Sequence, residues 1–327
     1  MKRSAFFIVA TVLLILSMVA SLKYGAVPIS WQEICNSFTS FDVSDQGQQL
    51  VRTLRLPRMF GSVLVGAGFA TAGALMQGIT NNPIADSGLL GINAGAGLGL
   101  ALVFAVTASP SPLTAIIASF FGAFVALIVI YIASSKLSIG FNPIRIVLLG
   151  AALSAFFSAI SQSISLVFQL NQDMTFWYVG GSANISWQQL RWAFPLILFG
   201  LIGTIFLAPQ VTLLSMGDET AITLGKKPAI IRKWSMGFVL LLAGTSVSLV
   251  GSVSFIGLIV PHVVRYFIGQ DYRLVLPASA LIGALFFVVA DIASRLIAPP
   301  LETPVGVLVT IIGVPLLLLQ IRRGSIT

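Results

Sequence analysis

The sequence predicts an all-α integral membrane protein: a ten-transmembrane-helix bundle with inverted-topology repeats. Hydrophobic residues make up 57% of the 327 residues and charged residues only 9%, too few polar groups to cover a surface in water. Uncharged apolar runs of roughly 18 to 20 residues, enough helix to cross ~30 Å of hydrocarbon, also recur along the whole chain. These runs do not alternate as barrel strands would, and an open sheet would leave unpaired peptide groups in lipid.

The apolar runs give the spans in order. Residues 5–22 follow two basic residues as a secretion signal does, but the run is long and no clear small-residue cleavage site follows, so we expect a retained span. Residues 234–264 are too long for one span, and the eighth span, within 255–269, is short enough to be buried or re-entrant. The ten spans come from residues 5–22, 59–85, 87–135 (two spans), 146–172, 192–217, 234–264 (two spans), 274–290 and 303–321.

A short internal similarity suggests duplication. GSVLVGAG at 61–68 and GFVLLLAG at 237–244 agree at five of eight positions and begin the second and seventh predicted spans. Spans five apart cross the membrane in opposite directions, which is the arrangement of an inverted-topology repeat in transport proteins.

Basic residues set the orientation, because they collect in short cytoplasmic loops. Ten spans place 12 of the Lys and Arg residues on the side of both termini and 6 on the other side. We therefore expect a single polytopic membrane domain, residues 1–327, with both termini cytoplasmic, an external loop at 23–58 and a cytoplasmic coupling loop at 209–233. A multi-pass membrane protein follows, and the net charge of +8 needs no nucleic acid to explain it.

Several kinds of chemistry are not expected. Cys35 is the only cysteine and His262 the only histidine, so neither a disulfide within the chain nor a cysteine- or histidine-rich metal site is predicted. We find no catalytic carboxylate pair, no nucleophile with a base and no phosphate-binding G-x-x-x-x-G-K-[ST] loop. No catalytic residue, no metal and no cofactor in this chain are therefore expected.

Arginines on the predicted external side depart from the usual charge bias. Arg55 and Arg58 lie in RTLRLPR just before the second span, and Arg295 lies at the outer end of the ninth. They could anchor lipid headgroups, or receive the carboxylates of an acidic partner. Asp291 precedes Arg295 by four residues, which is ion-pair spacing on a helix.

Three polar or turn features mark the second span and its cytoplasmic end. Gln77 could clip two helices together or line a pathway. The turns NNPIADSG at 81–88 and SIGFNP at 138–143 could simply connect helices, or close a central passage with Asn82 and Ile84 as the plug.

The stretch LLSMGDETAITLGKKPAIIRKW at 213–234 concentrates charge in the longest predicted cytoplasmic loop. Acidic residues at the start of SMGDETAITLGKKP and Gly225 near its end predict a short capped helix. It could lie along the headgroups, but its small apolar side is better suited to a groove in another protein. The residues of this predicted contact are Gly217, Asp218, Glu219, Ala221, Ile222, Leu224 and Gly225.

Motifs along nearly the full length resemble one family. The chain is similar to the FecCD family of permeases, the membrane subunits of binding-protein-dependent ABC importers for vitamin B12, siderophores and haem. The resemblance is carried by RLPR at 55–58, GAGFATAGALMQGITNNPIADSGLLGINAGAGLG at 66–99, WYVGG at 177–181, LLSMGDETAITLG at 213–225, VSFIGLIVPHVVRYFIGQDYRLVLPASALIGA at 253–284, ADIASR at 290–295 and PVGVLVTIIGVP at 304–315.

The resemblance implies an assembly and a function. Such permeases have ten spans each and pair around a central pathway, with two ABC ATPase subunits that use the ATP and an extracytoplasmic substrate-binding protein. By the same resemblance, residues 217–225 are the coupling helix, Arg55, Arg58 and Arg295 meet the binding protein, and Asn82 and Ile84 form the cytoplasmic gate, with Ile84 in place of the usual Leu.

The cargo and the pairing stay open at this stage. An iron chelate, a siderophore or haem, is favoured over cobalamin on frequency alone, and the second permease is either another copy or a homologue. A stand-alone secondary transporter or channel would need ionisable residues deep in the membrane, for which Asp291 is the single candidate. A membrane enzyme would need a cluster of His, Asp or Glu, which the sequence lacks.

Overall fold

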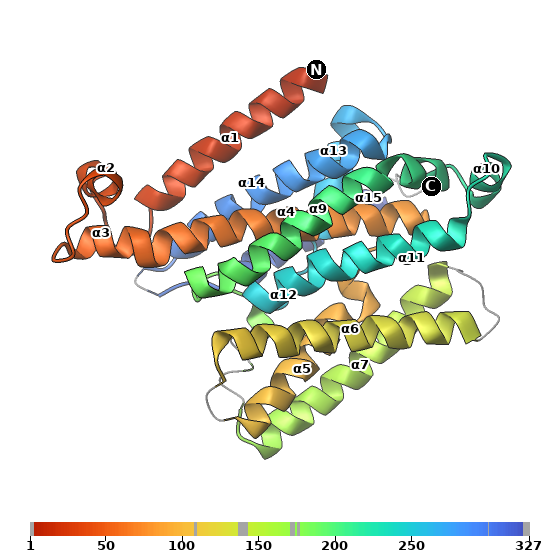
Figure 1. Ribbon diagram of the computed structural model, residues 1–327, viewed down its shortest axis with the longest axis horizontal. Coiled ribbons are helices and arrows are strands. Elements are labelled where there is room, and N and C mark those ends of the chain that lie inside the picture. The colour runs from red at the N-terminus through yellow and green to blue at the C-terminus, as the bar shows by residue number, and fades with distance from the viewer. Residues whose placement is uncertain are drawn as a thin grey trace.

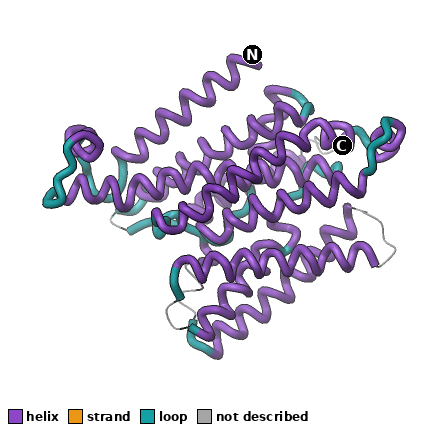
Figure 2. Tube along the Cα trace, viewed as in Figure 1, coloured by secondary structure: helices purple, strands orange, loops and turns teal. Residues whose placement is uncertain are grey.

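A computed structural model describes residues 3–107, 110–136, 143–170, 174, 177–299 and 301–322. Its regular elements in these ranges are all helical (Figures 1 and 2). They are α1 (Arg3–Lys23), α2 (Trp31–Thr39), α3 (Gln46–Leu50), η1 (Val51–Arg55), α4 (Leu56–Thr80), η2 (Ser87–Leu90), α5 (Ile92–Val106), α6 (Pro112–Lys136), α7 (Pro143–Val167), α9 (Trp187–Ser215), α10 (Asp218–Thr223), α11 (Pro228–Val239), η3 (Leu240–Gly244), α12 (Thr245–Val250), α13 (Ile256–Ile268), α14 (Tyr272–Leu296) and α15 (Val305–Arg322).

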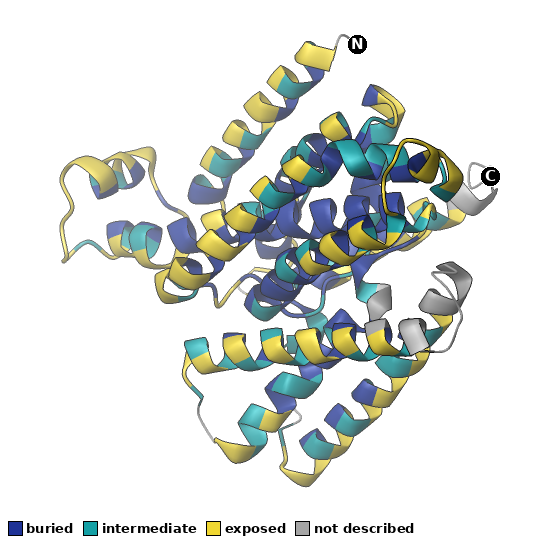
Figure 3. Cartoon of the chain, turned by 45° about the vertical axis from the view of Figure 1, so that its right-hand side comes forward, coloured by how far each residue is buried: buried dark blue, intermediate teal, exposed yellow. Residues whose placement is uncertain are grey.

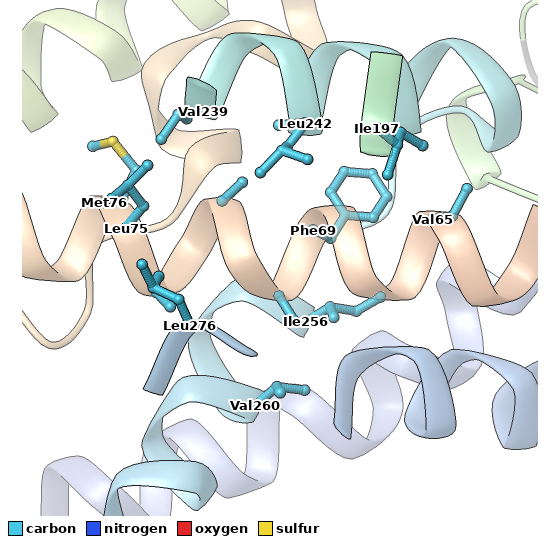
Figure 4. Close-up of a cluster of buried hydrophobic side chains, with 14 of the residues drawn as sticks. Val65, Phe69, Leu75, Met76, Ile197, Val239, Leu242, Ile256, Val260 and Leu276 are labelled. Carbon is cyan, nitrogen blue, oxygen red and sulfur yellow. The ribbon is translucent and has the colours of Figure 1, made fainter. Parts of the chain in front are cut away.

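Helix α4 is the centre of the bundle. Most of its residues are buried, and α9, α11, α13 and α14 pack around it. Figure 4 shows Val65, Phe69, Leu75 and Met76 of α4 facing Ile197 of α9, Val239 of α11, Leu242 of η3, Ile256 and Val260 of α13 and Leu276 of α14. An apolar helix surrounded in this way needs no polar face, which explains why the sequence of α4 shows no amphipathic stripe.

Small residues allow the closest helix crossings. A Cβ built on Gly66 of α4 would overlap the carbonyl oxygen of Gly283 in α14, and one on Gly73 would overlap Gly257 of α13. Gly95 of α5 meets Gly122 of α6 in the same way. At these crossings the backbones approach without intervening side chains.

The outer helices expose apolar side chains. Helix α1 exposes Ile8, Val12 and Leu16, and Figure 3 shows the exposed residues of this helix running along most of its length. Helices α5, α6 and α7 form a second group packed on one another, below the rest of the bundle in Figure 1. Apolar side chains exposed on a bundle surface are expected where the solvent is hydrocarbon.

The bundle has two distinct ends. Helices α2 and α3 lie at one, which we call the outer end, and α10 lies at the opposite one, which we call the α10 end (Figure 1). Helix α4 starts next to α3, whereas α11 starts next to α10, so these packed helices run in opposite directions (Figure 1). This is the relative direction that the predicted inverted repeat requires.

The apolar run of residues 234–264 is broken within the protein. Helices α11 and α12, joined through the wider turn η3, end at Val250, and residues 251–255 are not helical before α13 begins. The freed backbone groups find partners inside the chain: the amide of Gly181 donates to the carbonyl of Val250 at 2.8 Å, and that of Ser252 to Trp177 at 3.4 Å. Irregular backbone at membrane depth is tolerated where protein covers it in this way.

Seven helices in the described ranges are long and apolar enough to cross a membrane, and α5, α13 and α15 provide shorter apolar helices. The predicted count of ten spans is not confirmed by length alone. Two predicted boundaries differ from the structure. Helix α9 continues to Ser215, so the coupling loop is shorter than 209–233, and the external loop 23–58 contains α2, α3, η1 and the start of α4.

Candidate coupling, gating and docking sites

The stretch around residue 220 forms a short helix of 6 residues, α10, at the α10 end. Gly217 precedes it with φ of 113° and Gly225 follows with φ of 72°, backbone conformations that favour glycine at both ends. The amide of Lys226 donates to the carbonyl of Ala221 at 2.9 Å, which closes the last turn. The predicted Gly225 stop is confirmed, but no side chain caps the start.

The two sides of α10 differ from the prediction. Ala221 is fully buried against the chain itself, whereas Ile222 and Leu224 are 61% and 56% exposed. Glu219 is exposed as well. The expected contact with a partner therefore loses Ala221, because that methyl group already packs inside the bundle, and retains two large apolar side chains.

Asp218 ties α10 to the rest of the α10 end. Its carboxylate receives two hydrogen bonds from Arg232 of α11, at 2.9 and 2.6 Å, while the Nε of Arg232 donates to the carbonyl of Ile79 at 3.1 Å. No side chain caps the start of α10 because its N-cap residue is Gly217, and Asp218 in the first turn pairs with arginine instead. Arg232 was not expected to contribute, because its partners lie 14 and 153 positions away in the chain.

The candidate gate residues follow α4 directly. Asn81 ends the helix with φ of 49°, and its side-chain amide donates to the carbonyl of Leu214 in α9 at 3.2 Å. In the next turn the amide of Ile84 donates to the side-chain oxygen of Asn82 at 3.1 Å, and Ile84 is 38% exposed. The second predicted turn, 138–143, lies largely outside the described residues, so the plug stays a prediction.

A buried acid ends the candidate gate turn. Burial raises the pKa of the Asp86 carboxyl to about 6, while hydrogen bonds from the backbone amides of Ser87, Gly88 and Phe255 oppose this rise. Phe255 directly precedes α13 and has a positive φ of 73°, so Asp86 fastens the turn to the broken helix. One signal in the sequence marks this residue, because it is an acid between two uncharged runs.

The side chain of Gln77 in α4 connects this helix to α13 by hydrogen bonds, as expected of a clip between helices. Its amide nitrogen donates to the carbonyl of Gly257 in α13 at 2.9 Å, and its oxygen accepts from Arg265. Pro261 has no amide hydrogen to offer the carbonyl of Gly257 four residues earlier. Gln77 therefore supplies the missing donor. At 3% exposure it faces no open space in this chain, and its predicted role in a pathway remains untested.

A cluster of four charged residues lies at the outer end, where Arg58 is the central cation. Its guanidinium donates to Asp291 of α14 at 2.8 Å and to both oxygens of Glu302 at 2.7 and 2.9 Å. Asp291 also pairs with Arg295 at 2.8 Å, as the spacing of four residues predicted. We call Arg58, Asp291, Arg295 and Glu302 the outer ion cluster.

Two of the outer arginines also bind the end of α1. Arg55 donates to the carbonyls of Leu22 and Lys23 at 2.6 and 2.9 Å, and Arg295 donates to Ser21 and Tyr24. The last carbonyls of a helix have no partner within it and favour cations. The outer arginines are therefore turned into the chain, at 5, 7 and 3% exposure for Arg55, Arg58 and Arg295, and their predicted contact with a binding protein is not tested.

No metal-binding cluster stands out in the part of the chain that the structure describes, where no group of three or more His, Cys, Asp or Glu side chains could hold an ion. Cys35 is exposed at the outer end with a free thiol. It belongs to α2, and its predicted external position is not tested.

Comparison with known proteins identifies the family. The model of the FecCD transport family matches residues 13–323 of this chain. The chain belongs to the FecCD transport family. This family is one of transport proteins and not of enzymes, in agreement with the motifs quoted from the sequence.

Relatives cover almost the whole chain. The iron-uptake system permease protein FeuB of Bacillus subtilis (strain 168) is 35% identical over 94% of this chain and 92% of its own length. The hemin transport system permease protein HmuU of Yersinia pestis is 35% identical over 95% of this chain and 93% of its own. An inward-facing metal-chelate type ABC transporter matches the structure with a TM-score of 0.86 and 26% identity, over 98% of this chain and 99% of that chain.

Proposed function

We propose that this chain is the permease subunit of a binding-protein-dependent ABC importer for an iron chelate, a siderophore or haem. The observation that carries the proposal is α10, a short helix with two exposed apolar residues on a short loop, in a chain that belongs to a family of transport permeases. The printed names of the relatives FeuB and HmuU support iron uptake and haem as cargo classes.

The proposed assembly contains two copies of this chain, or one copy and a homologue, around a central pathway. Two ABC ATPase subunits bind at the α10 end, where they use the ATP, and an extracytoplasmic substrate-binding protein delivers cargo at the outer end. The protein is then a multi-pass component of the bacterial plasma membrane with both termini in the cytoplasm. Seven long and three shorter apolar helices support ten spans in all.

Short helices fit this count when their flanking segments are included. Helix α13 has 13 residues and reaches only about 20 Å as helix. The five residues 251–255 before it add roughly 16 Å if extended. Together they match the ~30 Å of hydrocarbon, so we propose that α13 is part of a broken span.

The mechanism follows from the rigidity of the parts. Closure of the ATPases moves α10, and because α10 is joined to α11 and α4, the membrane helices tilt with it. The pathway then faces the two sides of the membrane in turn. Docking of the binding protein at the outer arginines requires one of its carboxylates to reach Arg58. Arg58 is already paired with Glu302, whose side chain is 36% exposed, so an incoming carboxylate would reach Arg58 by replacing Glu302.

The ATPase contact has a direct test. The double substitution Glu219→Lys with Leu224→Asp reverses one charge on the exposed side of α10 and replaces an apolar side chain there with a carboxylate. A partner that covers this side would have to bury that carboxylate, which is unfavourable. We expect a co-expressed ABC ATPase no longer to co-purify, while the chain still inserts in the membrane. Thr220→Ser, on the same helix, is the matched control. Unchanged co-purification of the double variant would contradict the proposal.

Cobalamin is the alternative cargo of the same class. Uptake of a radiolabelled ferric siderophore and of radiolabelled cobalamin by cells lacking this chain separates the two, because just one of them should be lost. A stand-alone secondary transporter is disfavoured by the position of Asp291. This acid is fully buried and paired with Arg58 and Arg295, and so is not available as an ion-binding carboxylate.

A further inference from the structure

We propose that Arg232 is the positioning residue that transmits movement of α10 to the candidate gate. The inference rests on the proposed function, because α10 must be moved by an ATPase for anything to be transmitted. It assigns to one side chain a role that neither the family motifs nor the exposed face of α10 indicates.

The guanidinium of Arg232 joins three helices. Its two terminal nitrogens hold Asp218 in the first turn of α10, at 2.9 and 2.6 Å, and its stem belongs to α11. Its Nε donates to the carbonyl of Ile79, in the last turn of α4, at 3.1 Å. A planar guanidinium held on both edges fixes direction as well as distance, which a single lysine nitrogen cannot do.

The joint is placed where movement must pass. Ile79 lies three residues before Asn82 and five before Ile84, so the held carbonyl is in the last turn of α4, just ahead of the candidate gate. Arg232 is largely buried, with a side chain 11% exposed, whereas Asp218 on the moving helix is 45% exposed. Asp218 therefore lies toward the surface where the proposed ATPase binds, and Arg232 lies inside the bundle.

A second hydrogen bond also connects the end of α4 to a helix next to the α10 loop. Asn81 donates to the carbonyl of Leu214, in the last turn of α9 before α10, at 3.2 Å. The end of α4 is thus held by the helix before α10 and by the helix after it. Beyond the gate turn, Asp86 is bound by the amide of Phe255, which passes displacement on to the broken helix α13. Rotation of α10 alone would then displace Ile84.

The experiment follows the gate with a thiol, so no cargo is needed. The full chain carries Cys35→Ser and Ile84→Cys, is assembled with its ABC ATPase in nanodiscs, and is modified with a maleimide dye with and without ATP. In this parent we expect ATP to change the rate of modification. In Arg232→Lys we expect this ATP-dependent change to shrink by roughly tenfold, within the range of coupling free energies between sites.

Further measurements distinguish a positioning role of Arg232 from a general loss of structure. ATPase co-purification and ATP hydrolysis should be retained in Arg232→Lys, because the exposed face of α10 is intact. Asn81→Gly, which keeps the left-handed backbone but removes the second connection, should also weaken the response. Lys233→Gln, which removes the neighbouring exposed charge on α11, should respond to ATP like the parent.

The outcomes are distinct. If Arg232→Lys responds to ATP like the parent, the inference is overturned, whatever the response of Asn81→Gly. If Lys233→Gln loses the response as well, the effect is not specific to Arg232 and the inference is again overturned. If the parent neither binds the ATPase nor responds to ATP, the proposed function itself is overturned, and the inference with it.

Discussion

At the residue scale, the charged side chains inside the bundle are held in pairs and networks. Asp291 is fully buried and touches two arginines from different helices, so its charge is compensated where water cannot reach it. Glu302 completes the same cluster from a partly exposed loop. Removal of a buried partner leaves a bare charge, whereas removal of an exposed one leaves a charge that water can solvate.

The outer ion cluster therefore gives a prediction with an internal control. Asp291→Asn should lower the free energy of unfolding by about 3–5 kcal/mol, because two buried guanidinium groups lose their shared counter-charge. Glu302→Gln should lower it by less than about 1 kcal/mol. Thermal unfolding in detergent compares the two variants. Equal losses would contradict the conclusion that Asp291 is the buried counter-charge shared by Arg58 and Arg295.

The clip at Gln77 gives a second prediction at this scale. Gln77→Leu leaves the carbonyl of Gly257 without a donor in an apolar interior, at a cost of about 1–3 kcal/mol. Pro261→Ala restores an amide hydrogen four residues after Gly257 and should recover part of the loss in the double variant. Unfolding of both single variants and the double measures the coupling, and strict additivity would argue against this explanation of the clip.

At the element scale, the helices differ in what fixes their ends and crossings. Helix α4 packs against α14 through Gly66 and Gly283, where no side chain separates the backbones. Helix α10, in contrast, is defined by two glycines with positive φ and by the pairing of Asp218 with Arg232. The crossing of α4 with α14 therefore depends on glycines that have no side chain, whereas α10 depends on the backbone freedom of its flanking glycines and on one ion pair.

The helix crossing is testable with two alanines. Gly66→Ala should cost about 1–3 kcal/mol, because its new methyl group would meet a backbone carbonyl that cannot turn away. Gly237→Ala is the matched control on α11: a Cβ there meets nothing within 4 Å, so we expect no loss, or a gain of about 0.5–1 kcal/mol. Similar unfolding temperatures for both variants would show that the crossing tolerates separation.

At the scale of the whole molecule, the two ends carry different kinds of structure. The outer end gathers α2, α3 and the outer ion cluster, while the α10 end gathers α10 and the candidate gate turn (Figure 1). Helix α4 connects them directly, with Arg58 in its first turn and Asn81 at its end. A rigid central helix between two sites is a suitable path for coupling between cargo delivery and ATP use.

The orientation prediction belongs to this scale. Cys35, exposed at the outer end, should react with an impermeant thiol reagent added outside cells whose outer membrane, if present, has been removed. With Cys35→Ser and Glu219→Cys, the thiol at the α10 end should react after the cytoplasmic face is opened, and not before. Labelling of position 219 from outside would reverse the assigned topology.

Much of this architecture could be predicted from local sequence. Apolar runs located the helices to within a few residues, and the charged stretch with Gly225 located α10. The break near Phe255 was visible only as a run of unsuitable length, because a buried extended segment and a helix are equally apolar. The inward turn of Ala221 was likewise missed, since one methyl group suits either side of a short helix.

The sequence by itself determined the solvent, the helical class and the family, because hydropathy, helix period and motif order are properties of neighbouring residues. The pairing of Asp291 with Arg295 could be predicted from their spacing, but the tertiary structure alone decided which charges far apart in the sequence meet. Arg58 and Asp291 are separated by 233 positions and Arg232 and Ile79 by 153, and their contacts exist only once the helices are arranged around α4. For that reason the outer arginines, which looked available for a partner, are engaged within the chain.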